Sequence, residues 1–327
     1  MNYKYGIGAM SLNIVDACIE FANEYDHHLI FIPSRRQVDY IGGYVNNWTT
    51  ETFSTYVKTK TNNILLKRDH GGPNQGLYQD DGLTSLYHDC NYFDAIHIDP
   101  WKNTLNFKDG CEQTKKLINY CFEINNKIIY EVGTEQSIFK YEANQLDELL
   151  NYLKHNLNYD RFQNIKFAVI QSGTSLKETK NTGSYDKQRL TEMISICQKY
   201  NMISKEHNGD YLPVYLIKEK FNCGLDCINI APEFGQIETI TYLNEINNSK
   251  TFDTFFNICY ESKKWEKWVD KTFNPIENKE QLIKICGHYV LNDKNFIKKI
   301  KNNLRSDIDT IIKNNIIQKL KELYGTN

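Results

Sequence analysis

The sequence predicts a (β/α)₈ barrel, that is, a TIM barrel of the α/β class, with a helical C-terminal extension. Short apolar runs alternate with segments of helical periodicity across residues 1–247, and eight of the apolar runs have the length of strands. The runs are continuously apolar, as strands of parallel sheets buried on both faces are. Regular strand–helix alternation implies parallel strands, and eight of them favour a closed barrel over an open sheet. No GxGxxG follows the first strand, which argues against a dinucleotide-binding fold.

The elements can be taken in order along the chain. The predicted strands are Tyr5–Met10, Leu29–Pro33, a strand ending at Asp69, Phe93–Ile98, Lys127–Val132, Ile165–Gln171, Met202–Glu206 and Cys227–Ala231. The predicted helices between them are Leu12–Tyr25, one from about Thr50, Asp80–Asn91, Glu112–Asn125, Ala143–Leu157 and Tyr185–Tyr200. The cluster Thr49-Thr50-Glu51-Thr52 supplies the N-cap chemistry of the second helix.

The alternation stops after about Asn247. Phe252–Asp270 and Gln281–Tyr324 have the pattern of helices, with an Ile/Leu stripe in the second segment. We therefore expect a barrel domain over residues 1–247 and a helical extension over 248–327, packed on the barrel or against another subunit.

Composition narrows the class of protein. Of the 327 residues, 40% are hydrophobic and 24% are charged, which is ordinary for a soluble globular protein, and the net charge is −2. So small a charge gives no long-range field that would attract nucleic acid or an anionic membrane. The apolar runs are much shorter than a membrane span, and the N-terminus lacks the apolar core of a signal peptide. We expect a cytoplasmic location.

Polar and charged side chains follow most of the predicted strands, where the strands should end. In a (β/α)₈ barrel the chemistry takes place at the C-terminal ends of the strands, so these residues are candidates for an active site. They are Asp69, His70, Asp99, Glu131, Glu135, Gln171, Glu206, His207 and Glu233.

The segment Asp69-His70-Gly71-Gly72-Pro73-Asn74 is the strongest local signal. Adjacent side chains of a strand point to opposite faces, but a turn at the two glycines would let Asp69 and His70 converge. A metal-binding histidine beside a proton-transferring aspartate suits enolate chemistry. The alternative is a structural Asp69 that caps the next turn and a hydrogen-bonded His70.

His207 is the second candidate metal ligand, with Glu206 and Asp210 nearby. Together with His70, Glu135 and Gln171 it would complete a mixed nitrogen and oxygen site that suits zinc, or manganese if oxygen ligands dominate. His97 lies in the middle of a strand, so we expect it to be a hydrogen-bonded core residue.

Candidate anion sites lie at the same rim. Ser34-Arg35-Arg36-Gln37 places two guanidinium groups there, for bidentate recognition of phosphate or carboxylate. The alternative for these arginines is a salt bridge with Asp39 or Glu51. The small-residue turns after the fifth and sixth strands offer backbone N–H groups for a phosphate or a sugar hydroxyl, or are simply flexible loops.

An ordered set of motifs from the N-terminus to about Gly235 resembles one protein family, the non-catalytic subunit of class II D-tagatose-bisphosphate aldolase. The motifs are Gln37-Val38, Gly42-Gly43-Tyr44, Asp69-His70, Gly72-Pro73-Asn74, Ile96-His97-Ile98-Asp99, Gly133-Thr134-Glu135, Gln171-Ser172-Gly173 and His207 with Asp210-Tyr211. The resemblance implies a TIM barrel related to zinc-dependent class II aldolases and to ketose and keturonate epimerases. It also implies that Asp69 transfers a proton and His70 binds the metal.

The chain departs from this family at three places. Arg35 and Arg36 replace small polar residues, Lys67-Arg68 replaces glycines, and Gln171 stands where the catalytic aldolases use a histidine ligand. A more basic barrel mouth indicates an anionic substrate other than the usual sugar bisphosphate.

The resulting hypothesis is a metal-dependent, class II aldolase-like lyase or epimerase that acts on a phosphorylated or otherwise anionic ketose. The expected catalytic residues are Asp69, Glu206 and Glu135. The expected ligands of a zinc or manganese ion are His70, His207, Glu135 and Gln171. The expected substrate-binding residues are Ser34, Arg35, Arg36, Gln37, Asn74, Asp99, Ser172, Asp210 and Glu233.

The alternative implied by the family is a non-catalytic subunit that stabilises a separate aldolase. The expected partners are a sugar phosphate or sugar acid, and either further copies of this chain or a catalytic aldolase subunit. Nucleic acid and membranes are not expected partners.

Overall fold

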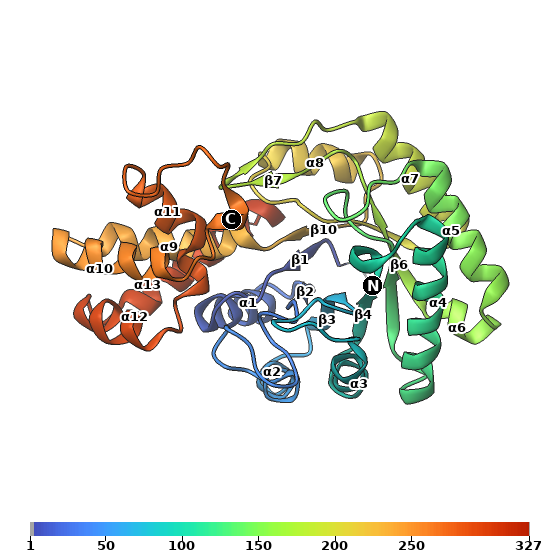
Figure 1. Ribbon diagram of the computed structural model, residues 1–327, viewed down its shortest axis with the longest axis horizontal. Coiled ribbons are helices and arrows are strands. Elements are labelled where there is room, and N and C mark those ends of the chain that lie inside the picture. The colour runs from blue at the N-terminus through green and yellow to red at the C-terminus, as the bar shows by residue number, and fades with distance from the viewer. Residues whose placement is uncertain (1–2, 327) are drawn as a thin grey trace.

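The computed structural model describes residues 3–326, in which eight parallel strands close into a barrel (Figure 1). Around the ring the order is β1-β10-β9-β6-β5-β4-β3-β2, so each strand lies beside its neighbour in the predicted series. The bounds are β1 Tyr5–Ile7, β2 Leu29–Phe31, β3 Ile64–Gly71, β4 Ala95–Ile98, β5 Ile129–Val132, β6 Ile165–Ile170, β9 Ile203–Glu206 and β10 Cys227–Ile230. The predicted fold class is confirmed.

Helices cover the outside of the barrel. Those between the strands are α1 Leu12–Glu24, α2 Thr50–Lys58, α3 Leu83–Tyr92, α4 Phe107–Ile124, α5 Ala143–Asn156, α6 Tyr159–Gln163, α7 Lys187–Lys199 and α8 Val214–Asn222. Thr49 caps α2 through a reciprocal pair of hydrogen bonds with Thr52, as the threonine cluster predicted.

Three features within the barrel region were not predicted from the sequence. They are the short helix α6, the helix α8, and a hairpin formed by β7 Leu176–Lys177 and β8 Lys180–Asn181. The hairpin belongs to the loop after β6, where Glu178 takes the left-handed backbone conformation that a tight turn requires. Such two-residue strands are too short to give a periodic signal in the sequence.

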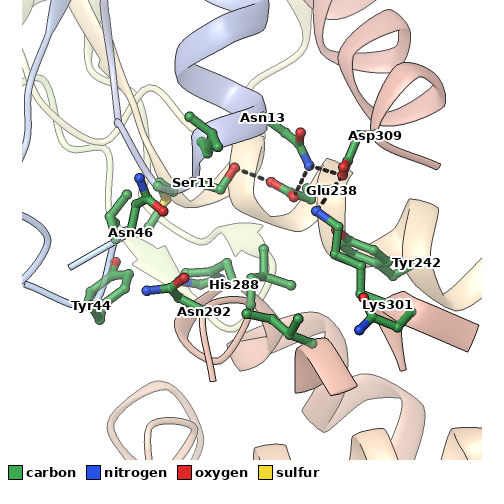
Figure 2. A pocket seen from close by; sticks show the side chains of 16 residues that line it. Ser11, Asn13, Tyr44, Asn46, Glu238, Tyr242, His288, Asn292, Lys301 and Asp309 are labelled. Atoms are coloured by element: carbon green, nitrogen blue, oxygen red, sulfur yellow. Dashed lines mark hydrogen bonds and ion pairs between the residues drawn. The ribbon is translucent and has the colours of Figure 1, made fainter. Parts of the chain in front are cut away.

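The C-terminal extension gathers on one side of the barrel (Figure 1). The elements after β10 are α9 Pro232–Glu245, α10 Ser249–Glu261, α11 Lys279–Cys286, α12 Lys294–Lys299 and α13 Ile308–Tyr324. Helix α13 packs against both α1 and α9, and the Tyr5 hydroxyl donates to the carbonyl of Leu323 at 2.8 Å. The junction of barrel and extension contains a polar cavity (Figure 2).

The extension is more broken than its apolar stripe predicted. Helix α10 ends at Glu261 instead of continuing to Asp270, because Lys263 adopts a left-handed conformation with φ 58°. The region predicted as one helical segment is divided into α11, α12 and α13, and the side chain of Asp293 caps α12. Within residues 3–326 we find no helix that is both long and apolar enough to cross a bilayer.

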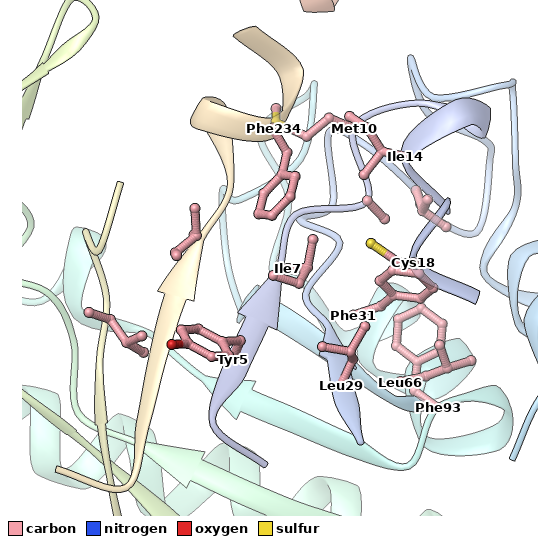
Figure 3. Packing of buried hydrophobic residues seen from close by; sticks show 14 of the residues in the cluster. Tyr5, Ile7, Met10, Ile14, Cys18, Leu29, Phe31, Leu66, Phe93 and Phe234 are labelled. Atoms are coloured by element: carbon pink, nitrogen blue, oxygen red, sulfur yellow. The ribbon is translucent and has the colours of Figure 1, made fainter. Parts of the chain in front are cut away.

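The main core lies between the barrel and its helices. Figure 3 shows Ile7, Phe31 and Leu66, from three adjacent strands, packed with Ile14 and Cys18 of α1. All five side chains are fully buried. Successive side chains of a strand point to opposite faces of the sheet, so the residues on either side of Ile7, Phe31 and Leu66 point into the barrel.

The inside of the barrel is filled in layers, as in other barrels of this kind. A layer near the N-terminal ends of the strands is apolar and includes Ile30, Leu65 and Ala95. Two residues further along, the inward positions are charged: Lys67, Glu131 and Lys205, all fully buried. Asp69, His97 and His207 lie two residues beyond Lys67, Ala95 and Lys205, and their side chains form the floor of the barrel mouth.

Candidate active site

The end of β3 carries a β-bulge that brings two adjacent side chains to one side. The pairing of β3 with β4 shifts register between Arg68 and Gly71, and His70 has φ 49°. A bulge adds one residue to a strand and re-aims its side chains. Asp69 and His70 therefore both face the barrel mouth, and their side chains are 16% and 18% exposed. The predicted convergence is present, and it depends on a left-handed residue that is not glycine.

Four side chains meet at the floor of the mouth: Asp69, His70, His97 and His207. Each offers one ligand atom, and these atoms all lie within 4.8 Å of one another. Asp69 Oδ2 is 3.6 Å from His70 Nε2, and its other oxygen, Oδ1, is buried without a hydrogen-bond partner among the described residues. The arrangement has the number and type of donors that hold a zinc ion.

The outer nitrogen of each imidazole is held by an acceptor. His70 Nδ1 lies 2.5 Å from Asp99, His97 Nε2 lies 2.9 Å from the carbonyl of Gly133, and His207 Nε2 lies 2.8 Å from Glu131. A carboxylate or carbonyl in this position fixes the tautomer and directs the other ring nitrogen toward the shared space. His97 Nδ1 also lies 3.3 Å from the backbone N–H of His70.

Burial and neighbouring charges favour the forms that can bind a metal, an ionised Asp69 and neutral His97 and His207. Burial would raise the pKa of Asp69, but the nearby cationic groups, His70 first, outweigh burial and lower it. Burial lowers the pKa of His207 to about 3 and holds that of His97 well below its usual value. Burial also disfavours the charged form of His70, but Asp69 and Asp99 raise its pKa to about 10. Metal binding at this site would therefore displace a proton from His70.

A buried ion cluster supports the group from below. Glu131 contacts Lys67 and lies 3.4 Å from Lys205, while its other oxygen accepts from His207. Both ammonium groups also lie over the ring of Phe167, at 4.8 Å and 5.8 Å from its centroid. The expectation that Lys67 makes the mouth more basic is corrected, because Lys67 is fully buried inside the barrel and forms an ion pair with Glu131.

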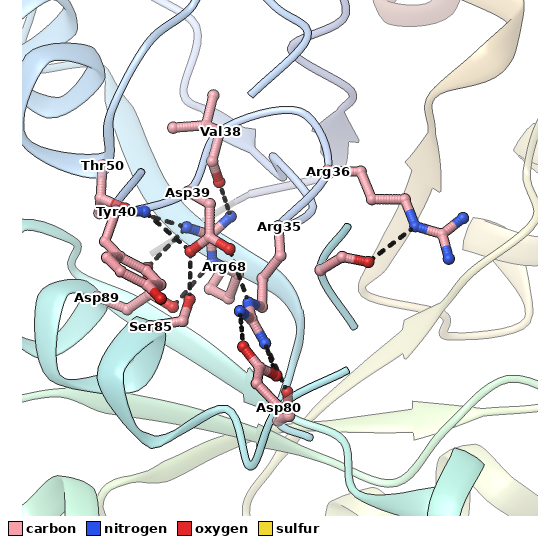
Figure 4. A network of polar contacts seen from close by, with 12 residues as sticks. Arg35, Arg36, Val38, Asp39, Tyr40, Thr50, Arg68, Asp80, Ser85 and Asp89 are labelled. Atoms are coloured by element: carbon pink, nitrogen blue, oxygen red, sulfur yellow. Dashed lines mark hydrogen bonds and ion pairs between the residues drawn. The ribbon is translucent and has the colours of Figure 1, made fainter. Parts of the chain in front are cut away.

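The arginines after β2 and in β3 divide into two kinds. Arg35 is 2% exposed and pairs with Asp39 at 3.0 Å and with Asp80 at 2.5 Å (Figure 4). Arg68 is fully buried and pairs with Asp89 at 2.7 Å. The expectation that Arg35 binds a substrate anion is therefore corrected: the alternative, a salt bridge with Asp39, is what the structure contains. Arg68 likewise does not contribute to the mouth.

Arg36 points the other way, into the mouth (Figure 4). The mouth is a cavity of about 250 Å³, and Lys267 and Trp268 of the extension line it together with Arg36. Arg36 makes one long contact, 3.4 Å from Nε to the carbonyl of Gly76. Among the described residues, neither Arg36 nor Lys267 has a carboxylate within ion-pair distance.

Several other predicted residues also line this cavity. They are Ser34, Gln37, Glu135 and Asp210. Asp210 lines the cavity and also holds the start of α9, because its Oδ1 accepts from the backbone N–H groups of Ala231 and Glu233 at 2.8 Å. Asp99 lies behind His70 rather than in the cavity, so it positions that histidine instead of contacting a sugar hydroxyl.

The remaining predictions are corrected by hydrogen bonding. Both ends of the Gln171 amide are used, by the carbonyls of Thr134 and Phe139 and by the N–H of Tyr141, so this residue is not placed as a metal ligand. Glu206 is 1% exposed and paired with Lys220 at 2.7 Å, which removes it from proton transfer.

Three of the predicted substrate-binding residues are likewise held elsewhere. Ser172 contacts both members of the Glu206–Lys220 pair. Asn74 bonds to Asn103 and to the backbone of Asp80. Glu233 pairs with Lys319 of α13 at 2.5 Å.

Sequence reasoning missed three residues of the site. His97 was expected to be a core residue, yet it lies two positions before Asp99 and shares the inward face with it, which is a signal the sequence contained. Glu131 was among the strand-end candidates, but its contacts with His207 and Lys67 were not predicted. Lys267 and Trp268 come from the extension, and no local pattern connects them to the barrel mouth.

Known proteins with a similar fold exist, but comparisons of the sequence alone find no match. No family model matches the chain, and no curated protein matches it either. A probable tagatose 6 phosphate kinase from Sinorhizobium meliloti 1021 has a similar structure, with a TM-score of 0.77, 14% identity, and coverage of 99% of this chain and 100% of that one.

Two further solved structures have a similar fold. The YdjI aldolase from Escherichia coli K12 gives a TM-score of 0.58 at 11% identity, covering 98% of this chain and 91% of its own. The fructuronate-tagaturonate epimerase UxaE from Cohnella laeviribosi gives 0.65 at 11% identity, covering 99% and 81%. At such identities the likeness concerns the fold, and it agrees with the TIM barrel predicted from the sequence. The chain has the barrel fold found in this aldolase and in this epimerase.

Proposed function

We propose that the protein is a metal-dependent, class II aldolase-like enzyme that acts on an anionic ketose, by aldol cleavage and condensation or by epimerisation. The observation that carries the proposal is the group of Asp69, His70, His97 and His207, whose ligand atoms lie within 4.8 Å of one another. The outer nitrogens of the three imidazoles are held by acceptors, and the Oδ1 of Asp69 has no hydrogen-bond partner among the described residues. Buried polar groups with only a structural role are normally hydrogen-bonded, so this group favours a functional role.

His70, His97 and His207 would hold the metal, with Glu135 at the cavity wall as a further oxygen donor. Three nitrogen ligands favour zinc over manganese. When bound, such an ion polarises the ketose carbonyl as a Lewis acid.

Asp69 is the group placed to move protons. In cleavage, its carboxylate takes the proton from the hydroxyl on the carbon β to the carbonyl; the C–C bond between the α and β carbons then breaks, and its electron pair stays on the α carbon as an enolate. Condensation is the same step reversed. Re-addition of the enolate to the opposite face of the released aldehyde, with the proton returned to the new hydroxyl, inverts that carbinol centre. One residue therefore serves both chemistries.

Arg36 and Lys267 would take the anionic group of the sugar. Among residues 3–326 neither has an acidic partner at ion-pair distance, and an unpaired guanidinium favours a bidentate phosphate or carboxylate. Because Lys267 comes from the extension, the extension would complete the substrate site. The names of the aldolase and of the ketouronate epimerase with similar folds support both reactions equally.

The test starts from the purified full chain loaded with zinc. Metal content is measured for the wild type, for His97→Ala and His207→Ala, and for His155→Ala, an exposed histidine of α5 that serves as the matched control. We expect one metal ion per chain, lost in the first two variants and kept in the third. Turnover is then assayed with D-tagatose 1,6-bisphosphate, D-fructose 1,6-bisphosphate and D-tagaturonate.

Two results would contradict the proposal. One is a chain that binds no metal, turns over none of the three sugars and co-purifies with a separate aldolase, which would support the non-catalytic subunit. The other is metal content that is unchanged in both barrel variants.

A further inference from the structure

A second cavity lies between the barrel and the extension (Figure 2). It measures about 240 Å³, the liquid volume of roughly eight water molecules. Met10 and Tyr44 line this cavity and also line the barrel mouth, so they form the wall between the two spaces. The exposed residues Leu12, Asn46 and Asn302 surround its opening, and its base is buried.

His288 at the base of this cavity has no partner for either ring nitrogen. The side chain is 2% exposed, and neither Nδ1 nor Nε2 has a hydrogen-bond partner among residues 3–326. Figure 2 shows the ring among the residues that line the space. A buried imidazole without partners is costly in a folded protein, so the arrangement indicates a bound molecule that supplies both a donor and an acceptor.

The other polar groups divide into a charged side and an uncharged side (Figure 2). On the charged side the groups are already paired: Lys301 with Asp309 at 2.8 Å, and Glu238 with Ser11 and Asn13. The uncharged side includes His288, Asn46, Asn292 and Tyr44.

The uncharged groups decide the kind of ligand. An amide and a neutral imidazole each donate and accept, which is also what a hydroxyl group does. Because Lys301 is paired with Asp309, and the oxygens of Glu238 are bonded to Ser11 and Asn13, a charged ligand would have to displace one of these contacts. Leu291 and Ile297 add apolar surface against which the C–H groups of a ligand can pack.

We propose that this second cavity binds a small uncharged polyol of about five carbons, held by His288, Asn46 and Asn292. The site is separate from the barrel mouth and independent of the proposed catalytic function. Its ligand needs neither a carbonyl group nor an anionic group, in contrast to the ketose proposed for the mouth.

The experiment is a calorimetric titration of the full chain with ribitol, an uncharged five-carbon polyol, and separately with inorganic phosphate and with ethylammonium. We expect saturable binding of one ribitol per chain and none of the two ions. Asn292→Ala removes a half-buried amide and should weaken ribitol about three- to tenfold, the effect of one neutral hydrogen bond. Asn295→Ala, an exposed amide on α12 outside the cavity, is the matched control and should change nothing.

Two more variants locate the binding. His288→Phe should abolish it, and circular dichroism shows whether that variant folds; Asn292→Ala keeps the test valid if it does not. His207→Ala, in the barrel mouth, should bind ribitol as the wild type does. The proposal is overturned if ribitol does not bind, if Asn292→Ala and Asn295→Ala bind it equally, if His207→Ala loses it, or if phosphate or ethylammonium binds in its place.

Discussion

Arg68 and Asp69 are neighbours in β3, yet they belong to two groups of opposite character. Arg68 faces outward into a network in which the guanidinium bonds to Asp89, Pro33 and Val38. Asp69 faces inward to the histidines, and its Oδ1 has no hydrogen-bond partner in the described part of the chain. In the network of Arg68 the donors are bonded to acceptors, whereas in the group of Asp69 a buried carboxylate oxygen has no hydrogen-bond partner among the described residues.

The difference shows why charge and position along a strand do not identify a site. Arg35 and Arg68 have the residue type and location of substrate ligands, but their donors are used by Asp39, Asp80 and Asp89. Each imidazole is held at its outer nitrogen, and the inner nitrogen of His97 also accepts from the backbone N–H of His70 at 3.3 Å. A group is available for chemistry when its bonding capacity exceeds what the fold uses.

Replacing the open carboxylate should have the largest effect. We expect Asp69→Asn to lower kcat by about 10²- to 10⁴-fold, the usual contribution of a proton-transfer group, with metal content and stability nearly unchanged. Steady-state kinetics on whichever sugar is turned over provides the measurement. Asp160→Asn, an exposed aspartate of α6, is the control. Full turnover by Asp69→Asn would remove Asp69 from the mechanism.

Breaking the closed network should affect stability instead. Arg68→Ala leaves the fully buried Asp89 without its cation, and such a loss costs about 3–5 kcal/mol of the free energy of unfolding. Urea denaturation measures it, with Arg305→Ala as the control, because the Arg305–Asp307 pair is exposed and its loss should be silent. Equal free energies of unfolding for Arg68→Ala and Arg305→Ala would show that the Arg68 network does not stabilise the fold.

Glu238 tests what happens to a buried carboxylate without a cation at ion-pair distance. Burial raises its pKa from 4.5 to about 7. The folded protein therefore keeps a proton that the unfolded chain loses, so this stabilisation is complete below pH 4.5 and is lost as the pH rises to about 7. We expect the free energy of unfolding to fall by up to about 3 kcal/mol over that range, and Glu238→Gln to remove this part of the decrease. Denaturation at a series of pH values checks it, and identical profiles for the two proteins would contradict it.

The smallest effect is expected at the rim. Arg36→Gln removes an unpaired cation from the mouth and should raise KM for an anionic ketose about tenfold, with kcat and stability little changed. The same kinetics with a dephosphorylated or uncharged analogue should show no difference between wild type and variant. A larger effect on kcat than on KM would place Arg36 nearer the reacting atoms.

The fold was well predicted because its signal is local. Most of the eight strands are or begin with short apolar runs that alternate with helices, so the pattern needs no knowledge of distant contacts. The convergence of Asp69 with His70 was predicted from a turn at Gly71-Gly72, whereas the structure achieves it through the left-handed His70 and the bulge in β3. The roles of Gln171 and Glu206 were not predicted, because each depends on partners from another part of the chain, whereas the salt bridge of Arg35 with Asp39 was one of the two predicted alternatives.

By itself the sequence determined the barrel, the rim at which polar residues gather, and Asp69, His70 and His207 as members of one site. Only the tertiary structure decided that His97 completes the group, that Glu206 and Arg35 are held in ion pairs, and that Lys267 reaches the mouth. The reason is physical: periodicity records which face of an element is buried, whereas the use of a polar side chain depends on which partners the fold brings within hydrogen-bond distance.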